Sequence, residues 1–324
     1  MKKKLEIFCT LGPASLNRQF LKFSKNNISL LRLNMSHIEA KDLPKMIKLI
    51  RKYTSTPICI DTEGAQIRTK TSTVKHYKKN QIIFFHKKKK RKIFYPDYVT
   101  DNLRRGDKLD IGFNSLKVII KKNTNKLLVF KVLEGGLFEN NKGVHLINRK
   151  IKLKYLTDKD LEAIKIAKNL KIHNFALSFT NSVSDMKNFS NILPKENKIY
   201  KIETKNALKS IRSILKNGSN FLIDRGDLSK EVSIEMIPLA QRQILKNALK
   251  LKNKNVYVAT NFLESMIIHA APTRGEVNDI YSTLRLGAKG LVLAAETAIG
   301  KHPIFCIKML KKIYKIFYKN YKKL

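Results

Sequence analysis

Short apolar runs recur along the chain, and most of them end in polar or charged residues. The first three runs cover residues 5–10, 29–33 and 57–60. Five later runs cover residues 174–179, 198–202, 220–223, 256–260 and 290–294. Continuous apolar runs of this length are typical of buried parallel strands. Polar segments with helical character separate them, so the pattern predicts repeated βα units.

Several of the intervening segments favour helices. The clearest span residues 39–53 and the amphipathic residues 302–321, and residues 204–217 are predicted as one further helix. The sequence TDKD at 157–160 is typical of a helix N-terminus, with a capping Thr and an acidic first turn. About eight βα units with charge at the strand ends predict an α/β fold, a (β/α)8 (TIM) barrel.

The pattern changes between residues 70 and 153. Runs of Val, Ile, Leu and Phe alternate there with Gly, Asn and Asp, and we predict β-hairpins at 106–120 and 126–138. The basic run KKKKRK at 87–92 is predicted to be a solvated loop or strand tip. An all-β insert is typical of a small separate domain. The predicted domains are therefore a barrel of residues 1–69 and 154–324, and an all-β domain of residues 70–153 inserted after the third strand.

Charged residues gather at the ends of two successive runs. The first run delivers Lys201 and Glu203, and the second delivers Asp224, Arg225 and Asp227. A strand, a helix and a strand within about thirty residues form a βαβ unit, whose strands are parallel neighbours. Glu203 and Asp227 should then lie side by side at the carboxyl edge of the sheet.

Two carboxylates in that position suit a hard cation such as Mg²⁺, and Lys201 suits a phosphate or a developing oxyanion. The alternative is a structural ion cluster at the strand ends. Burying several charges costs stability unless a ligand compensates them, which favours the binding site.

The net charge is +41, from 66 Lys and Arg against 25 Asp and Glu. The excess is spread along the chain, is mostly Lys, and comes with many Asn and Ile and no Trp. A/T-rich codons supply that mixture. A nucleic-acid-binding protein gathers basic residues on one face, with aromatic residues between them. We therefore predict no specific nucleic-acid partner.

The positions of the cysteines and the lengths of the apolar runs indicate the cellular compartment of the protein. Cys9, Cys59 and Cys306 lie in apolar segments without metal-ligand spacing, as expected of buried, reduced thiols. Residues 1–4 resemble the start of a signal peptide, but the apolar run that follows is too short. No segment approaches the roughly twenty apolar residues of a membrane span. The prediction is a cytoplasmic protein that binds no membrane.

Ten sequence fragments, most of them at the ends of the runs, resemble the pyruvate kinase family. In the family's order they are CTLGPAS, RLNMSH, DTEGAQIRT, NNKGV, SFTNSVSD, KIE, RGDL, ATNFLESM, PTRGEVND and AETAIGKHP. They extend from residue 7 to about residue 311, and ten in order leave little room for chance. The resemblance implies a (β/α)8 barrel interrupted after its third strand by a β lid domain, which agrees with the predicted insert.

The resemblance also implies a reaction, the last step of glycolysis. In it the phosphoryl group of phosphoenolpyruvate passes to ADP, giving pyruvate and ATP. Lys201 would stabilise the enolate oxygen and the phosphoryl group in transit, and Arg32 and Arg68 would contact that group. Thr260 would lie beside the carbon that is protonated, although a Thr at a strand end also commonly caps the next helix. Charge clamps of this kind are what phosphoryl transfer requires.

The implied cofactors are Mg²⁺ (or Mn²⁺) and K⁺. Arg68, Lys142 and Asn34 are the implied cofactor-binding residues, with Lys142 near the nucleotide phosphates. The implied metal ligands are Glu203 and Asp227 for Mg²⁺, and Asn34, Ser36, Asp61 and Thr62 for K⁺. We expect Asp61 to be poorly compensated without a cation.

Ala65, in place of Pro, and Asp110-Ile111, in place of two acidic residues, depart from the family pattern, and so do four positions that bear on activity. Gln66 replaces Glu, Asn181 replaces Arg, Ser229 replaces Gly and Ala294 replaces Ser. In the family, Glu at the Gln66 position accompanies K⁺ dependence and Lys accompanies independence. These changes leave open an alternative, a weakened paralogue that acts as a binding or regulatory module.

The family's C-terminal domain has no counterpart in the resemblance, so regulation by sugar phosphates is expected to be missing. The remaining implied partners are phosphoenolpyruvate and ADP or ATP, and a homo-oligomer assembled through the barrel.

Overall fold

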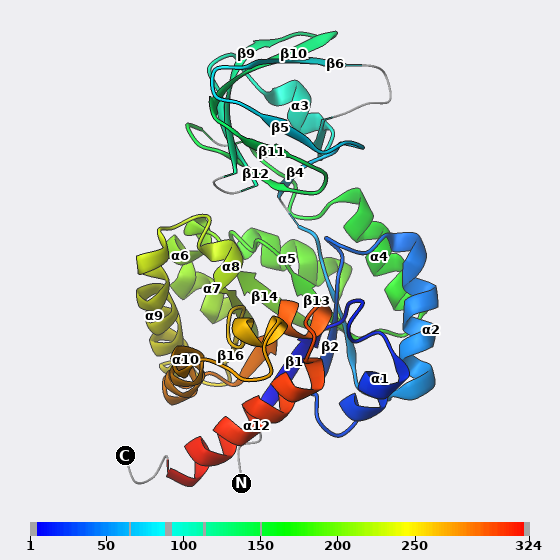
Figure 1. Cartoon of the computed structure of the whole chain (residues 1–324). Coiled ribbons are helices and arrows are strands. Elements are labelled where there is room, and N and C mark those ends of the chain that lie inside the picture. The colour runs from blue at the N-terminus through cyan, green and yellow to red at the C-terminus, as the bar shows by residue number, and fades with distance from the viewer. Residues whose placement is uncertain (1–4, 65, 88–92, 113–114, 150, 321–324) are drawn as a thin grey trace. The chain divides into compact units, whose positions relative to one another are not determined.

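The computed structural model describes residues 5–64, 66–87, 93–112, 115–149 and 151–320 (Figure 1). The chain divides into two compact units, Met1–Gly64 with Asp158–Leu324, and Ala65–Thr157. Residues 1–4 and 88–92, for which the sequence suggested a leader-like start and a basic loop, lie outside the described residues.

The first unit is built on a closed barrel of eight parallel strands in the order β1-β17-β16-β15-β14-β13-β3-β2. The predicted α/β barrel is thereby confirmed. The second unit is inserted between β3 and β13, which are hydrogen-bonded neighbours in the barrel. The barrel strands are β1 (Glu6–Thr10), β2 (Leu30–Asn34), β3 (Ile58–Asp61), β13 (Asn174–Leu177), β14 (Asn197–Ile202), β15 (Asn220–Asp224), β16 (Asn255–Ala259) and β17 (Gly290–Leu293).

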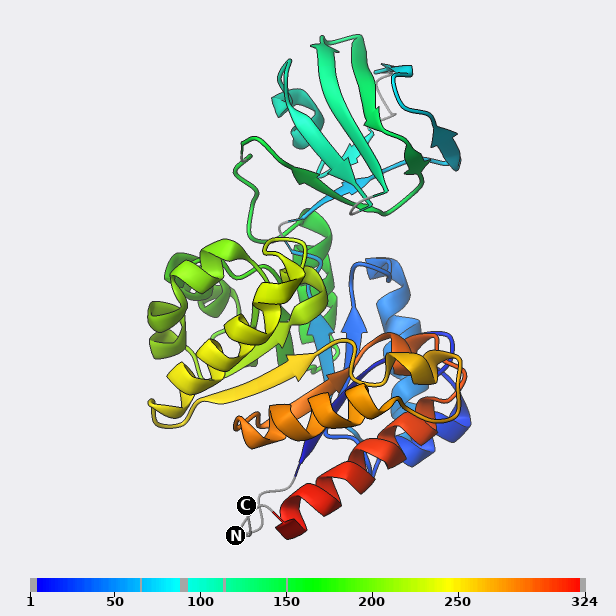
Figure 2. The same ribbon diagram turned by 60° about the vertical axis from the view of Figure 1, so that its left-hand side comes forward.

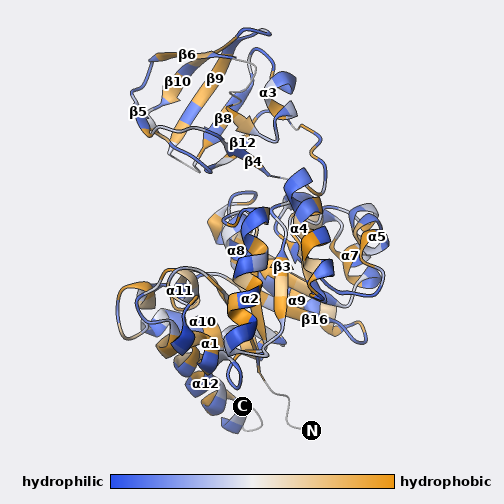
Figure 3. Ribbon diagram, turned by 90° about the vertical axis from the view of Figure 1, so that its right-hand side faces the viewer, coloured by the Kyte–Doolittle hydropathy of each residue, from blue (hydrophilic) through white to orange (hydrophobic). Residues whose placement is uncertain are grey.

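Most positions in these strands are apolar (Figure 3), and most are buried, as expected of strands covered on both faces. One cluster of buried side chains draws a residue or two from each strand, among them Phe8 and Tyr257, whose rings lie 4.3 Å apart. The interior is therefore a packed core, and side chains that reach ligands must come from the strand ends.

Helices surround this barrel, as Figure 2 shows from a second side. The last of them, α12, buries Cys306, Leu310 and Phe317 along one stripe, as its amphipathic pattern predicted. The α-helices of this unit are α1 (Arg18–Ser24), α2 (Leu43–Tyr53), α4 (Asp158–Asn169), α5 (Val183–Ile192), α6 (Lys205–Lys209), α7 (Ile211–Asn217), α8 (Arg225–Leu228), α9 (Ile237–Leu249), α10 (Arg274–Arg285), α11 (Ala295–Ala298) and α12 (Pro303–Asn320). Short 3-10 turns are η1 (Ala40–Asp42), η2 (Ile234–Met236) and η3 (Glu264–Ile267).

Two of these helices replace the single one predicted over residues 204–217. Thr204 caps α6 by accepting a hydrogen bond from the Ala207 amide at 3.0 Å. Ser210 then ends α6 and begins α7, because its backbone leaves the helical region at φ −98° and ψ 11°. Ser favours helix ends over helix interiors, which explains a break that apolar periodicity does not show.

The second unit is antiparallel. Its main sheet has seven strands in the order β6-β10-β9-β8-β12-β4-β7, and β11 pairs with β5 in a second sheet. A short helix, α3, was not predicted. β4, at residues that the sequence pattern assigned to the barrel, pairs with β12 and β7 here. The elements are β4 (Ile67–Thr69), β5 (Lys75–Tyr77), β6 (Ile82–His86), β7 (Phe94–Tyr95), α3 (Tyr98–Asn102), β8 (Lys108–Ile111), β9 (Leu116–Asn123), β10 (Leu127–Glu134), β11 (Gly136–Phe138) and β12 (Gly143–Leu146).

One of the two predicted hairpins is confirmed and the other is wrong. β8 and β9 are antiparallel neighbours within residues 106–120. In residues 126–138, however, β10 pairs with β9 and β6, and β11 pairs with β5. Gly135 and Gly136 make a turn-like sequence, but a Cβ at Gly136 would lie 1.4 Å from the carbonyl oxygen of Ser115. The glycine therefore permits close backbone packing at this point.

Candidate active site

Lys201 lies at the carboxyl end of β14 and is only 4% exposed. Its ammonium group is 2.6 Å from Glu203 Oε1, 3.4 Å from Asp61 Oδ2 and 3.4 Å from Asp224 Oδ2. The Ser178 hydroxyl lies 3.2 Å away. Burial alone lowers the pKa of a lysine, but the three carboxylates outweigh it and raise the pKa of Lys201 above its ordinary value. Lys201 is therefore a fixed, buried cation.

Glu203 follows β14 directly and is completely buried. Its Oε2 atom accepts a hydrogen bond from the Phe179 amide at 2.6 Å. Its Oε1 atom lies 2.6 Å from Lys201, but that contact lacks hydrogen-bond geometry. Burial, with Asp227 and Asp224 adding to it, raises the pKa of Glu203 to about 8 despite the lysine. The carboxylate thus lies where a further cation would stabilise its charged form.

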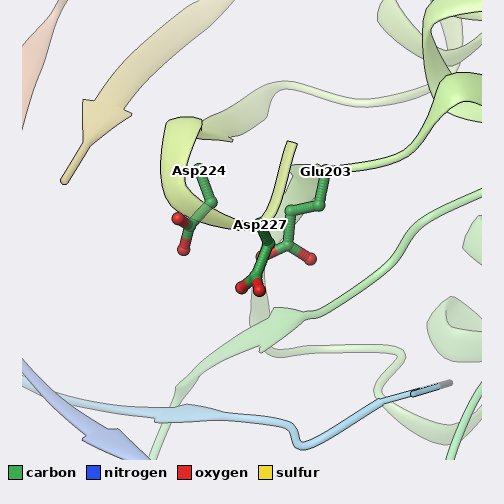
Figure 4. Close-up of side chains that lie close together, drawn as sticks. All are labelled: Glu203, Asp224 and Asp227. Atoms are coloured by element: carbon green, nitrogen blue, oxygen red, sulfur yellow. The ribbon is translucent and has the colours of Figure 1, made fainter. Parts of the chain in front are cut away.

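Three carboxylates converge beside this lysine. Glu203, Asp224 and Asp227 each offer an oxygen, and the three oxygens lie within 4.8 Å of one another. Figure 4 shows the three groups extending to the same side of the turn that contains α8. Hard oxygen donors at this spacing fit Mg²⁺ or Mn²⁺. The structure thus brings Glu203 and Asp227 together as expected, and it adds Asp224, which the sequence analysis noted but did not assign to the metal.

Arg32, the middle residue of β2, pairs with Asp61 on the neighbouring strand. The distance from Nη1 to Asp61 Oδ2 is 3.1 Å, and the arginine is 5% exposed. Ser178 also donates to Asp61, at 3.2 Å. The expectation that Asp61 is poorly compensated is therefore wrong, because Arg32 and Lys201 both neutralise it.

The other three residues expected at the K⁺ site lie around the same strand ends. Asn34 and Asp61 are register partners on β2 and β3. The Ser36 amide donates to Asn34 Oδ1 at 3.0 Å, and Thr62 Oγ1 accepts from the Ser178 amide at 3.0 Å. Their oxygens are suitable donors for a monovalent cation, but each has a protein partner.

Thr260 follows β16 with φ +74°, a conformation that is strained for a β-branched residue. Its hydroxyl accepts a hydrogen bond from the Gly226 amide at 2.9 Å. It therefore caps α8, on the neighbouring strand end, and not the helical turn that follows it in sequence. Arg225 holds this backbone by donating to the carbonyl oxygens of Ala259 and Thr260, and its guanidinium lies 4.3 Å from the Phe262 ring centre. Rigid support of a strained residue is typical of functional sites.

Arg68 and Lys142 belong to the second unit and are described within it. Arg68 Nη1 donates to the Asn141 carbonyl at 3.1 Å. Lys142 is paired with Glu139 at 3.0 Å, and its side chain is 45% exposed. Gln66 is 9% exposed, and its Oε1 atom is buried without a hydrogen-bond partner. The expected roles of these residues stay predictions.

Asn181, Ser229 and Ala294, three further departures from the family pattern, have local structural roles. Asn181 accepts from the Thr204 hydroxyl at 2.7 Å and donates to the Phe179 carbonyl at 3.0 Å. Ser229 donates to the Gly226 carbonyl at 2.8 Å, in the last turn of α8. The Ala294 amide donates to Glu296 Oε2 at 2.8 Å. These contacts brace loops at the same edge of the barrel.

The fold and these residues define a (β/α)8-barrel protein with a candidate site for a divalent cation and an anionic group. The family model for the pyruvate kinase barrel domain matches residues 2–307. The chain belongs to the pyruvate kinase family, a family of phosphotransferases.

Curated relatives bear the same name. The chain is 33% identical to a pyruvate kinase of Methanocaldococcus jannaschii, covering 99% of this chain and 71% of the relative. It is also 33% identical to that of Thermotoga maritima, covering 97% and 71%. Plastidial pyruvate kinase 3 of Arabidopsis thaliana is 30% identical over 96% of this chain, which spans 57% of that relative's length. In the part of the chain that the structure describes, no helix is long and apolar enough to cross a membrane.

Proposed function

We propose that the protein is a pyruvate kinase, which transfers the phosphoryl group of phosphoenolpyruvate to ADP and forms pyruvate and ATP. The observation that carries the proposal is the buried Lys201 ammonium beside three carboxylates that suit a divalent cation. Phosphoryl transfer relies on positioning and on charge stabilisation, and it needs no covalent nucleophile.

Lys201 has the main catalytic role in this proposal. A fixed ammonium group stabilises the negative charge that develops on the enolate oxygen and on the transferring phosphoryl group. Arg32 is buried, and Asp61 forms ion pairs with both Arg32 and Lys201. In this proposal Arg32 binds the phosphate before transfer. Because both cations are held in place by carboxylates, little reorganisation accompanies charge development.

Glu203 and Asp227 would hold Mg²⁺ or Mn²⁺. Such an ion neutralises phosphate charge and polarises the substrate's oxygen atoms when it is bound. The chain's own contribution is to fix the carboxylates: the Phe179 amide holds Glu203, and Lys230 pairs with Asp227 at 2.8 Å.

Thr260 is proposed to lie beside the carbon that receives the proton, on a backbone that Arg225 fixes. Arg68 and Lys142 are proposed to contact the transferring phosphoryl group and the nucleotide. Support for these two roles is the family membership, together with their positions in the matched fragments.

The experiment is pyruvate formation from phosphoenolpyruvate and ADP by purified protein with Mg²⁺ and K⁺. Turnover of at least about 1 per second, within the usual range for kinases, supports the proposal. Turnover below about 0.001 per second by a protein that still binds phosphoenolpyruvate would instead favour the weakened paralogue. Gln66, Asn181, Ser229 and Ala294 are the positions at which such a loss would be traced.

K⁺ dependence is part of the proposal. Asn34, Ser36, Asp61 and Thr62 retain the oxygen donors, and Gln66, being neutral, cannot replace the ion's charge. We expect the rate to rise with KCl when tetramethylammonium chloride keeps the ionic strength constant. Gln66→Lys should lower the K⁺ requirement, and Gln66→Glu should lower the half-saturating concentration. Full activity without K⁺ would refute this part.

The proposal also includes a cellular compartment and an oligomeric state. The three cysteines are buried and free, which suits a reducing compartment such as the cytoplasm. We also propose a homo-oligomer that assembles through the barrel, and its mass in solution, measured by sedimentation, tests this.

A further inference from the structure

Asp224 is the last residue of β15, and it is 5% exposed. It points to the same side as Glu203 and Asp227 in Figure 4, and its Oδ2 atom is 3.4 Å from the Lys201 ammonium. The roles proposed above assign Glu203 and Asp227 to the cation and give Asp224 no role of its own. A buried carboxylate carries a large desolvation cost, so its presence here requires a partner of matching charge.

Lys201 by itself does not account for Asp224. The ammonium group already has Glu203 at 2.6 Å and Asp61 at 3.4 Å, so Asp224 is its third carboxylate neighbour. One fixed positive charge cannot balance three buried negative ones.

The neighbouring cations are engaged by other carboxylates. Arg32 pairs with Asp61 at 3.1 Å, and Lys230 pairs with Asp227 at 2.8 Å.

Glu203 provides an independent sign that a ligand belongs here. Its Oε1 atom is buried and accepts no hydrogen bond in proper geometry. Buried carboxylate oxygens are normally satisfied by donors or by a metal ion. The oxygen lies within the carboxylate cluster, where the described residues supply no further hydrogen-bond donor to it.

We propose that Asp224 is a third carboxylate ligand of the divalent cation. The inference rests on the cation site of the proposed function and extends it by one ligand. Mg²⁺ in kinase-type sites is usually held by one or two carboxylates together with substrate phosphates. A third carboxylate supplies the charge that the substrate otherwise contributes.

The test is a titration of the full chain with Mn²⁺ in the absence of substrate, with free Mn²⁺ measured by electron paramagnetic resonance. Wild type is expected to bind one Mn²⁺, and Asp224→Asn should weaken that binding by about tenfold or more, because affinity follows the number of charged ligands. Asp224→Glu, which keeps the carboxylate, should stay within about threefold of wild type.

Two controls accompany these variants. Asp42→Asn makes the same change of charge at an exposed position on η1 and should leave the Mn²⁺ affinity within about twofold, since distant surface charges are screened. Glu203→Gln should abolish binding. An unfolding curve should be measured for every variant to check that it is folded.

Two results would overturn the inference. One is no Mn²⁺ binding by wild type. The other is an Asp224→Asn affinity within about twofold of wild type, because a twofold change is too small for a lost charged ligand. The titration needs no turnover. Asp224-dependent Mn²⁺ binding by a protein that forms no pyruvate would therefore sustain the inference while the proposed function failed.

Discussion

The polar groups at the two edges of the barrel differ in whether they are paired with one another. At the amino edge, strands begin with asparagines that pair one to one. Asn197 donates to Asn174 at 3.1 Å, and Asn255 donates to Asn220 at 2.9 Å, each across a register pair. These amides are neutral and satisfy one another, so this edge requires no ligand.

At the carboxyl edge, two of the same strands, β14 and β15, end in charged residues. Lys201 has three carboxylates within 3.4 Å, and Asp227 adds a fourth beside Glu203. Polar groups that serve stability are paired within the protein, whereas several carboxylates that converge on one buried ammonium group indicate a ligand. The contrast within one set of strands is therefore the main support for the site.

The largest expected effect comes from removing the cation at the carboxyl edge. Lys201→Met should abolish phosphoryl transfer and leave phosphoenolpyruvate binding largely intact, because a charge that acts on the transition state contributes several kcal/mol there, on the order of 3 or more. Steady-state turnover and equilibrium binding of the substrate measure the two effects. A variant that keeps more than about a tenth of wild-type turnover would refute the role of Lys201.

Glu276 is a carboxylate whose hydrogen-bond donors come from the protein itself, and it can be compared with Glu203. Glu276, on α10, accepts from the Ser265 hydroxyl at 2.6 Å and from the Thr273 amide at 2.7 Å. Burial acts to raise its pKa, but hydrogen bonds from Ser265 and Thr273 outweigh it and hold the pKa of Glu276 below its ordinary value. Glu203, whose pKa is raised, shows the opposite shift.

Glu276→Gln should therefore lower the free energy of unfolding by about 1–2 kcal/mol at pH 7. A lowered folded-state pKa stabilises the protein above the unfolded pKa, and this contribution is lost as the pH falls through the folded value. The difference between variant and wild type should shrink from about pH 4.5 downward. Urea unfolding at pH 7, 5 and 3 measures it, and a difference that grows in acid would contradict the assignment.

The smallest effect is expected at the amino edge. Asn255→Ala removes one amide pair and should lower the free energy of unfolding by about 1 kcal/mol. Turnover should stay within about twofold, because the amino edge of such barrels serves stability. A loss of activity without a loss of stability would show that the two edges are not divided in this way.

Much of this arrangement is readable from the sequence. Both ends of all eight barrel strands were predicted to within two residues. Strands that are covered on both faces appear in the sequence as largely apolar runs, which makes them easy to locate. Lys201, Glu203 and Asp227 were assigned from one βαβ unit, in which parallel neighbours bring their ends together.

Other features depend on pairing between distant segments. The compensation of Asp61 by Arg32 follows from the register of β2 against β3, which no local pattern contains. The partner of β11 is β5, about sixty residues earlier, although its local sequence suggested a hairpin. Asp224 was visible as a charge at a strand end, but its direction toward Lys201 and Glu203 required side-chain positions.

The cation site at the carboxyl edge can be tested without substrate, by measuring the thermal unfolding midpoint as a function of MgCl₂ while NaCl keeps the ionic strength constant. If the carboxylate cluster binds a cation, saturating Mg²⁺ should raise the wild-type midpoint by about 3–4 °C, since a ligand at a hundredfold excess over its Kd adds roughly 2–3 kcal/mol. Asn255→Ala should keep this shift, and Glu203→Gln should lose it. An unchanged wild-type midpoint, or an equal shift in Glu203→Gln, would contradict the account.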